Sequence, residues 1–153
     1  MREPMVVASF RRLLEGPMTR SPRDAWTWLL ALLGAGSLAN GAWMLASPAG
    51  WYEGIPAAVP DFGPLNPHFV RDIGCAYLTV GLALLWAARR VELRAPLVLV
   101  ATLFFAAHAL LHVHDTLRGL VHAGHWGLDL PGVYLPAALL VLASVHFARQ
   151  EAS

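Results

Sequence analysis

The 153-residue sequence contains no lysine and one cysteine, and only 14% of its residues are charged, against ~25% in typical soluble domains. Its 11 basic residues are therefore all arginines, scattered along the chain rather than gathered in one basic stretch. A nucleic-acid-binding protein needs a concentrated basic face, so nucleic acid is excluded as a partner. The single cysteine, Cys75, excludes an internal disulfide and a metal site made of cysteines alone.

Familiar catalytic signatures are also absent from the sequence. It has no nucleotide-binding glycine loop and no nucleophile–base motif. The conventional hydrolase, kinase and dehydrogenase classes are therefore excluded, and the question of enzymatic activity stays open.

Long apolar stretches dominate what is present. The hydrophobic fraction is 57% and the mean hydropathy is +0.52. Four apolar blocks occupy residues 26–46, 69–88, 95–113 and 132–148. The first block has no charge and, at ~1.5 Å per residue, is long enough to cross a ~30 Å hydrocarbon layer. The pattern predicts an all-α fold, an integral membrane four-helix bundle over residues 26–148.

The arginines predict the orientation of this bundle, because cytoplasmic segments are enriched in them. The predicted cytoplasmic segments are the tail of residues 1–25, the connection between the second and third spans, and the tail of residues 149–153. Their arginines are Arg2, Arg11, Arg12, Arg20, Arg23, Arg89, Arg90, Arg94 and Arg149. Only Arg71 and Arg118 fall on the other side. We expect both termini in the cytoplasm and a multi-pass protein of the bacterial inner membrane.

The N-terminal tail has its own amphipathic pattern. Apolar residues recur at helical spacing beside Arg11 and Arg12, namely Val6, Val7, Phe10, Leu13 and Leu14. This pattern predicts a short interfacial helix on the cytoplasmic leaflet. The alternative, a twin-arginine export signal, fits less well, because the following apolar block exceeds the usual ~7–15 residues of a signal core.

Ionisable residues at membrane depth are the unusual feature of the sequence. On the third span, His108, His112 and Asp115 have the spacing i, i+4, i+7, which places them on one helix face. On the second span, His68 and Asp72 begin a polar stripe that continues through Cys75 and Thr79. Counting the rise per residue places both stripes in the outer half of the bundle.

Three interpretations of this polar layer are open. Imidazoles and carboxylates together suit copper, zinc or iron, which predicts a metal site at His108, His112, Asp115, His68 and Asp72. Haem b held between His68 and a histidine of the third span is a second interpretation. The third is an ion-pair network, in which Arg71 pairs with Asp115, and Asp72 pairs with a histidine or Arg118.

The outer connections carry further polar residues. His122 and His125 lie in the segment HAGHWG, as additional ligands or as solvated loop residues. The proline-rich loop of residues 51–67 carries Glu53 and Asp61 and is placed to cap the polar layer.

The layout of four spans after an amphipathic tail, with the segment NPHFVRD at residues 66–72, resembles the small DoxX-like four-helix inner-membrane proteins of bacteria. The resemblance covers most of the chain and implies a four-helix bundle. It does not include the HxxxHxxD run of the third span.

The sequence thus favours a membrane protein that binds a transition metal near the periplasmic face, with redox chemistry as one consequence. One alternative is a non-catalytic accessory subunit that packs against a larger membrane complex. Another is a protein that binds quinone or lipid, with Arg71 and the histidines around a head group. The lipid bilayer is the expected surrounding in each case, with a membrane-protein partner or a homo-oligomer as further expectations.

Overall fold

The computed structural model describes residues 24–151, and every secondary-structure element in that range is helical. The long helices are α2 (Ala25–Ala46), α4 (Pro67–Arg89), α5 (Arg94–Leu117) and α7 (Leu135–Glu151). All four predicted apolar blocks are thereby confirmed as helices. The predicted interfacial helix of the N-terminal tail lies outside the described residues.

Each of the four long apolar segments can cross a membrane. The stretches Ala25–Ala46, Pro67–Arg89, Val91–Leu117 and Leu130–Gln150 all have the length and hydropathy that a span requires. Many large apolar side chains on these helices are exposed, among them Leu32, Leu82, Leu103 and Leu142. An exposed apolar surface of this extent belongs in contact with lipid. These properties identify a multi-pass membrane protein.

Local sequence signals fix where α2 and α4 begin. Asp24 is the N-cap of α2, and its Oδ1 accepts a hydrogen bond of 2.7 Å from the backbone N–H of Thr27. Asn66 caps α4 in the same way, accepting from the N–H of Phe69 at 3.1 Å. Pro67 follows at the first helical position, where its missing N–H has no helical partner to lose.

Helix α5 extends one turn beyond the predicted end of the third span. The helix ends at Leu117, and Gly119, two residues further on, has a left-handed φ of +68°. The N–H of Gly119 donates to the carbonyl of Thr116 at 3.1 Å, and that of Leu120 donates to the carbonyl of Asp115 at 2.9 Å. These two bonds form a Schellman motif, which reverses the chain direction after α5. The connection that follows, which carries His122 and His125, therefore folds back beside the C-terminal end of α5.

Two short helical turns precede α7, namely α6 (His125–Leu128) and η3 (Leu130–Tyr134), a π-helical turn. Pro136 has no N–H and cannot donate to a carbonyl in this turn. The N–H groups of Tyr134 and Leu135 instead reach five residues back, to the carbonyls of Asp129 and Leu130. The wide turn thus accommodates the proline at the start of the helix.

Glycines bring α2 and α4 into close contact. A Cβ atom added at Gly41 would lie 2.7 Å from the carbonyl oxygen of Gly74, and one added at Gly81 would lie 2.9 Å from that of Gly34. Only glycine fits at these crossings, a common solution for packing membrane helices.

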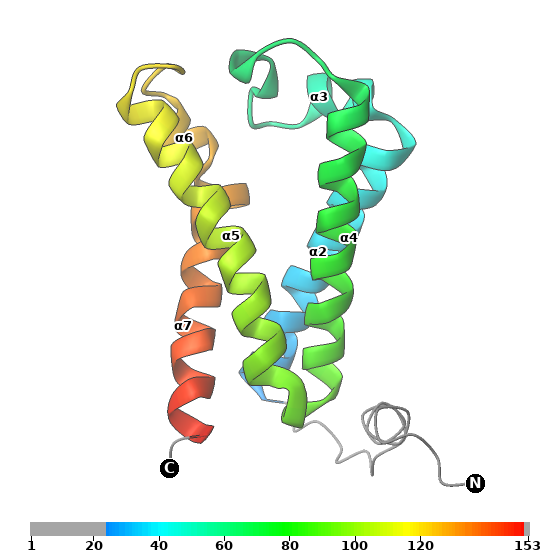
Figure 1. The fold of residues 1–153 in the computed structure, drawn as a ribbon, viewed down its shortest axis with the longest axis vertical. Helices are drawn as coiled ribbons and strands as arrows, with labels where there is room; N and C mark the ends of the chain where they lie inside the picture. The colour runs from blue at the N-terminus through cyan, green and yellow to red at the C-terminus, as the bar shows by residue number, and fades with distance from the viewer. Residues whose placement is uncertain (1–23, 152–153) are drawn as a thin grey trace, which may run out of the picture.

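The helices form two pairs, α2 with α4 and α5 with α7, which diverge toward one end (Figure 1). That end, here called the open end, carries α3 (Pro48–Gly54), η1 (Val59–Phe62) and α6. At the opposite end, here called the closed end, Arg94 joins the helices. Its guanidinium lies 2.8 Å from Asp24 of the α2 cap, donates to the carbonyl of Ala87 in α4 at 3.4 Å, and covers the ring of Phe147 in α7.

Candidate metal centre and the adjoining cavity

Three metal-ligating side chains meet at the open end, from two connections that are far apart in the sequence. They are Asp61 of η1, His122 of the turn after α5, and His125 at the start of α6. Their ligand atoms all lie within 4.8 Å of one another, and no second such group of three occurs among residues 24–151. Asp61 Oδ2 is 3.1 Å from Nε2 of each histidine. Ligands around a tetrahedral ion with bonds of ~2.0–2.1 Å are ~3.3 Å apart, so the two distances from Asp61 are close to those around a small divalent ion.

Backbone geometry holds Asp61 in this position. The short helix η1 lies between two residues with left-handed backbone, Ala58 with φ +47° and Gly63 with φ +125°. The hydroxyl of Tyr52 in α3 donates to the carbonyl of Gly63 at 2.7 Å and ties the loop to the α2–α4 pair. Asp61 is therefore presented by a segment anchored on one helix pair, whereas the two histidines belong to the other.

The two histidines differ in what lies on the Nδ1 side of the ring. The ring of His122 accepts a hydrogen bond at Nδ1 from the N–H of Gly124 at 3.0 Å, so its neutral form carries the proton on Nε2, which lies 3.1 Å from Asp61. Binding a metal at Nε2 requires the proton to move to Nδ1, which breaks the Gly124 bond. His125 Nε2 hydrogen-bonds to Asp61 at 3.1 Å, so its neutral ring also carries the proton on Nε2, and metal binding there moves this proton to Nδ1. In His125, unlike His122, a carboxylate lies on the Nδ1 side of the ring and can accept it.

That carboxylate is Asp129, which is fully buried, as is His125. Asp129 Oδ2 lies 3.5 Å from Nδ1 of His125, an ion-pair contact, and 2.8 Å from Nδ1 of His112. A carboxylate behind a ligating histidine fixes the tautomer of the ring and raises its basicity. His125 Nδ1 and Asp129 Oδ1 both lack a hydrogen bond despite complete burial. The polar interior of this end is therefore only partly satisfied.

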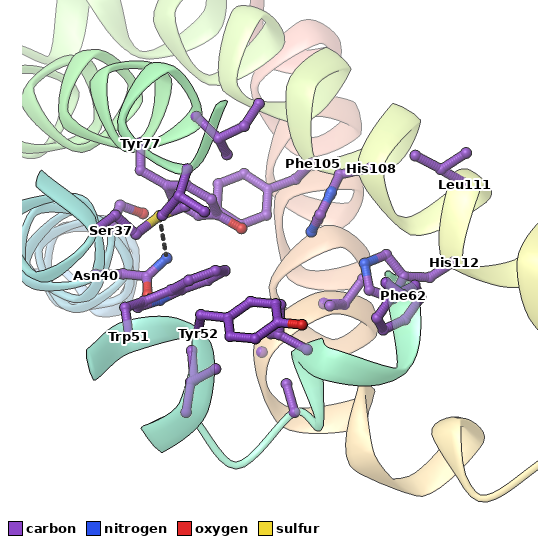
Figure 2. A pocket seen from close by; sticks show the side chains of 18 of the residues that line it. Ser37, Asn40, Trp51, Tyr52, Phe62, Tyr77, Phe105, His108, Leu111 and His112 are labelled. Carbon is purple, nitrogen blue, oxygen red and sulfur yellow. Dashed lines mark hydrogen bonds between the residues drawn. The ribbon is translucent and has the colours of Figure 1, made fainter. Parts of the chain in front are cut away.

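A cavity of about 680 Å³ lies beside this group, between the two helix pairs. Residues of α2, α3, η1, α4, α5 and η3 line it, and its walls are mostly apolar and aromatic. His108, His112 and Asp115 all contribute to the lining. The rings of His108 and His112 lie 4.6 Å apart, and the His108 ring points into the cavity (Figure 2).

Phe62 separates the candidate metal centre from the cavity. It follows Asp61 in η1, and its ring packs edge-on against His112 at 4.9 Å and His125 at 4.8 Å. Oδ2 of Asp129 contacts Nδ1 of both of these histidines. An alternating series of imidazoles and carboxylates thus runs from the exposed Asp61 to the cavity wall.

The structure brings together only some of the residues predicted from the sequence. His108, His112 and Asp115 share a face of α5, as expected, and line one cavity. Asp115 contacts His114 Nδ1 at 3.0 Å, and Arg71 donates to the carbonyl of Leu45 at 3.4 Å. The predicted ion pair between Arg71 and Asp115 is therefore wrong.

The stripe on α4 lies elsewhere. His68 and Asp72 contact each other at 3.4 Å, with 88% and 59% of their side chains exposed, and neither lines the cavity. Helix α4 instead packs through its small and aromatic residues, such as Gly74, Tyr77 and Gly81. This packing turns the polar stripe outward, so the five predicted ligands do not form one cluster.

The connections between the long helices hold more of the candidate site than the sequence predicted. Asp61 was expected only to cap the polar layer, His122 and His125 were considered as additional ligands, and Asp129 was not considered. The spacing of His122, His125 and Asp129, at i, i+3 and i+7, is a signal that could have been used. Asp61 carries no comparable signal, because it lies 61 positions before His122 in the sequence. Comparisons with protein-family models, curated proteins and solved structures find no match for this chain.

Proposed function

We propose that this chain is a multi-pass protein of the bacterial inner membrane that binds a divalent transition-metal ion at its open end. The ligands are Asp61, His122 and His125, and Asp129 orients His125 from behind. The convergence of three ligand atoms within 4.8 Å, from two separate connections, is the observation that carries the proposal. A mixed set of imidazole and carboxylate ligands suits zinc, copper(II) or iron(II).

The charges near the site support binding of a cation. Asp61, Asp129 and Asp115 supply three carboxylates to the site and the adjoining cavity. Among residues 24–151, no arginine lines the cavity, and the sequence has no lysine. Three protein ligands would leave one position of a tetrahedral ion open to water or an external ligand.

The arginines support a periplasmic location for the site. Arg89, Arg90, Arg94 and Arg149 lie at or near the helix ends of the closed end. Placing that end in the cytoplasm satisfies the enrichment of arginine in cytoplasmic segments. The open end then faces the periplasm, and both ends of the four-helix region lie on the cytoplasmic side.

The direct test is a zinc titration of detergent-purified, metal-stripped protein by calorimetry, with elemental analysis of the bound ion. We expect one ion per chain. Asp61→Asn and His125→Gln remove a ligand and should weaken binding at least ~100-fold, whereas Asp129→Asn should weaken it ~10–100-fold because it acts through His125.

His114→Gln is the matched control, since His114 is exposed, lies at the same end and belongs to no ligand group. A second variant, His108→Ala, separates this proposal from the site predicted on α5. Zinc binding that persists in Asp61→Asn would overturn the proposal, and so would loss of zinc in His108→Ala alone. Binding equal in His114→Gln and the unmodified protein would support it.

A further inference from the structure

The cavity beside the candidate metal centre has the properties of a ligand site in its own right. Its volume of about 680 Å³ falls within the ~300–1,000 Å³ of typical small-molecule sites. It lies between the two helix pairs, where they diverge toward the open end. Because the cavity is lined mostly by apolar residues of membrane-spanning helices, its ligand is expected to be an apolar molecule that dissolves in the bilayer.

The walls are unusually rich in flat rings. The aromatic residues that line the cavity are Trp51, Tyr52, Phe62, Phe69, Tyr77, Phe104 and Phe105. They come from both helix pairs and from the connection between α2 and α4, so they surround the space rather than cover one side (Figure 2). Aromatic walls favour stacking or edge-on contact with another flat ring.

Spare hydrogen-bond donors point into the same space. No other residue in the described part of the chain hydrogen-bonds to the ring of His108, which contacts Phe104 and Tyr77 only through their rings. The hydroxyl of Tyr77 is directed toward the cavity near His108 (Figure 2). Asn40 accepts from the indole of Trp51 at 2.8 Å, while its NH₂ group has only the sulfur of Met44 at 3.7 Å. A ligand that brings acceptor oxygens would satisfy these donors.

The charges of the lining select against ionic ligands. None of the described arginines lines the cavity, so a phosphate or a fatty-acid carboxylate would find no cationic partner in this part of the chain. Asp115, the acid in the lining, would repel both. Asp115 already contacts His114 at 3.0 Å, which reduces its attraction for a cationic head group.

We propose that this cavity binds a neutral, lipid-soluble molecule with a flat ring and carbonyl acceptors on an apolar tail, which is the chemistry of a membrane quinone. His108 and Tyr77 donate hydrogen bonds to the carbonyl oxygens, and the aromatic walls hold the ring. This site does not depend on the metal, because none of Asp61, His122 and His125 lines the cavity.

A decyl-substituted benzoquinone is the probe for metal-free protein in lipid nanodiscs, with quenching of tryptophan fluorescence as the readout because Trp51 lines the cavity. Decylbenzene, dodecanoate and dodecyltrimethylammonium are the comparison compounds. We expect saturable binding of one quinone per chain, at least tenfold tighter than any of the three. His108→Leu should weaken quinone binding about tenfold while leaving decylbenzene unaffected.

Gly36 provides a way to fill the cavity without disturbing the fold. It lines the space, and a Cβ atom added there meets nothing within 4 Å. Gly36→Leu should therefore abolish quinone binding, whereas Ala35→Leu, at an exposed position of the same helix, should not. Equal binding in these two variants would overturn the proposal. Tightest binding of dodecyltrimethylammonium or dodecanoate would overturn it as well, by assigning the cavity to a charged ligand.

Because zinc is absent from this experiment, its failure would leave the proposed metal site standing. Conversely, a failed zinc titration would leave the quinone result unchanged. The two proposals are thereby tested separately.

Discussion

The two ends of the bundle use buried polar groups in opposite ways. At the closed end, Arg94 has 5% of its side chain exposed and forms bonds to Asp24, Thr27 and the carbonyl of Ala87. Its polar atoms are engaged in holding helices together. At the open end, imidazoles and carboxylates gather in the connections, and two of their buried polar atoms, His125 Nδ1 and Asp129 Oδ1, have no hydrogen bond.

The buried atoms without hydrogen bonds show the difference. Among residues 24–151, His125 Nδ1, Asp129 Oδ1 and the Tyr134 hydroxyl at the open end are buried and lack a hydrogen bond. At the closed end, Arg90 Nε is the only such atom in the described part of the chain, and it still lies 3.6 Å from Glu92. An unsatisfied buried polar atom costs ~1–3 kcal/mol. The open end is therefore the less completely hydrogen-bonded of the two, and this is the end at which we propose the metal site.

The largest expected effect comes from breaking the closed end. Removing one partner of a buried ion pair costs ~3–5 kcal/mol, and since a third of the Asp24 side chain is exposed we expect ~2–4 kcal/mol for Arg94→Gln. The measurement is reversible unfolding in mixed micelles, with Arg89→Gln, at an exposed position, as the control. If Arg94→Gln unfolds like Arg89→Gln, the arginine does not join the helices. The folded fraction of Arg94→Gln should still bind zinc, because the two ends are separate.

Lowering the pH should also destabilise the closed end, by less than Arg94→Gln does. Burial alone would raise the pKa of Asp24, but hydrogen bonds from Arg94 and Thr27 outweigh it and lower the pKa from 3.8 to about 2. The unfolded chain therefore binds the proton more readily. The stabilisation is complete well above pH 3.8 and is lost as the pH falls through about 2. Melting temperatures measured from pH 5 to pH 2 should fall less steeply in Asp24→Asn, and parallel curves would contradict this assignment.

Much of the fold could be predicted from the sequence, because the signals are local. A span is encoded by an uninterrupted apolar stretch, and the N-caps Asp24 and Asn66 each lie just before a helix. The shared face of His108, His112 and Asp115 follows from helical periodicity alone. These features need no knowledge of which helices are neighbours.

The residues of the candidate site could not be predicted from helical periodicity, because they depend on how the helices and connections pack together. Which face of α4 turns inward is decided by its crossing with α2 at Gly74 and Gly81, so the outward direction of its polar stripe follows from packing. Asp61 meets His125 only because two connections at the same end fold toward each other. In a membrane, apolar residues face both lipid and protein, so a polar stripe does not by itself mark the interior.

Two pairs with the same residues and spacing give the sharpest comparison and the smallest expected effect. His68 with Asp72 and His125 with Asp129 are both His-x-x-x-Asp pairs, with contacts of 3.4 Å and 3.5 Å. The first pair is largely exposed and the second is fully buried. Exposed ion pairs contribute little, so His68→Ala with Asp72→Ala should change the free energy of unfolding by no more than ~0.5 kcal/mol. Zinc affinity should not change either.

The same double substitution at His125 and Asp129 should abolish zinc binding, because it removes a ligand together with the group that orients it. Both double variants are measured by the same calorimetric titration and unfolding experiment. If the exposed pair on α4 changed zinc affinity as much as the buried pair, the ligand set would extend to α4, as the sequence first suggested. A difference confined to the buried pair would show that environment, rather than residue type or spacing, decides which of the two binds metal.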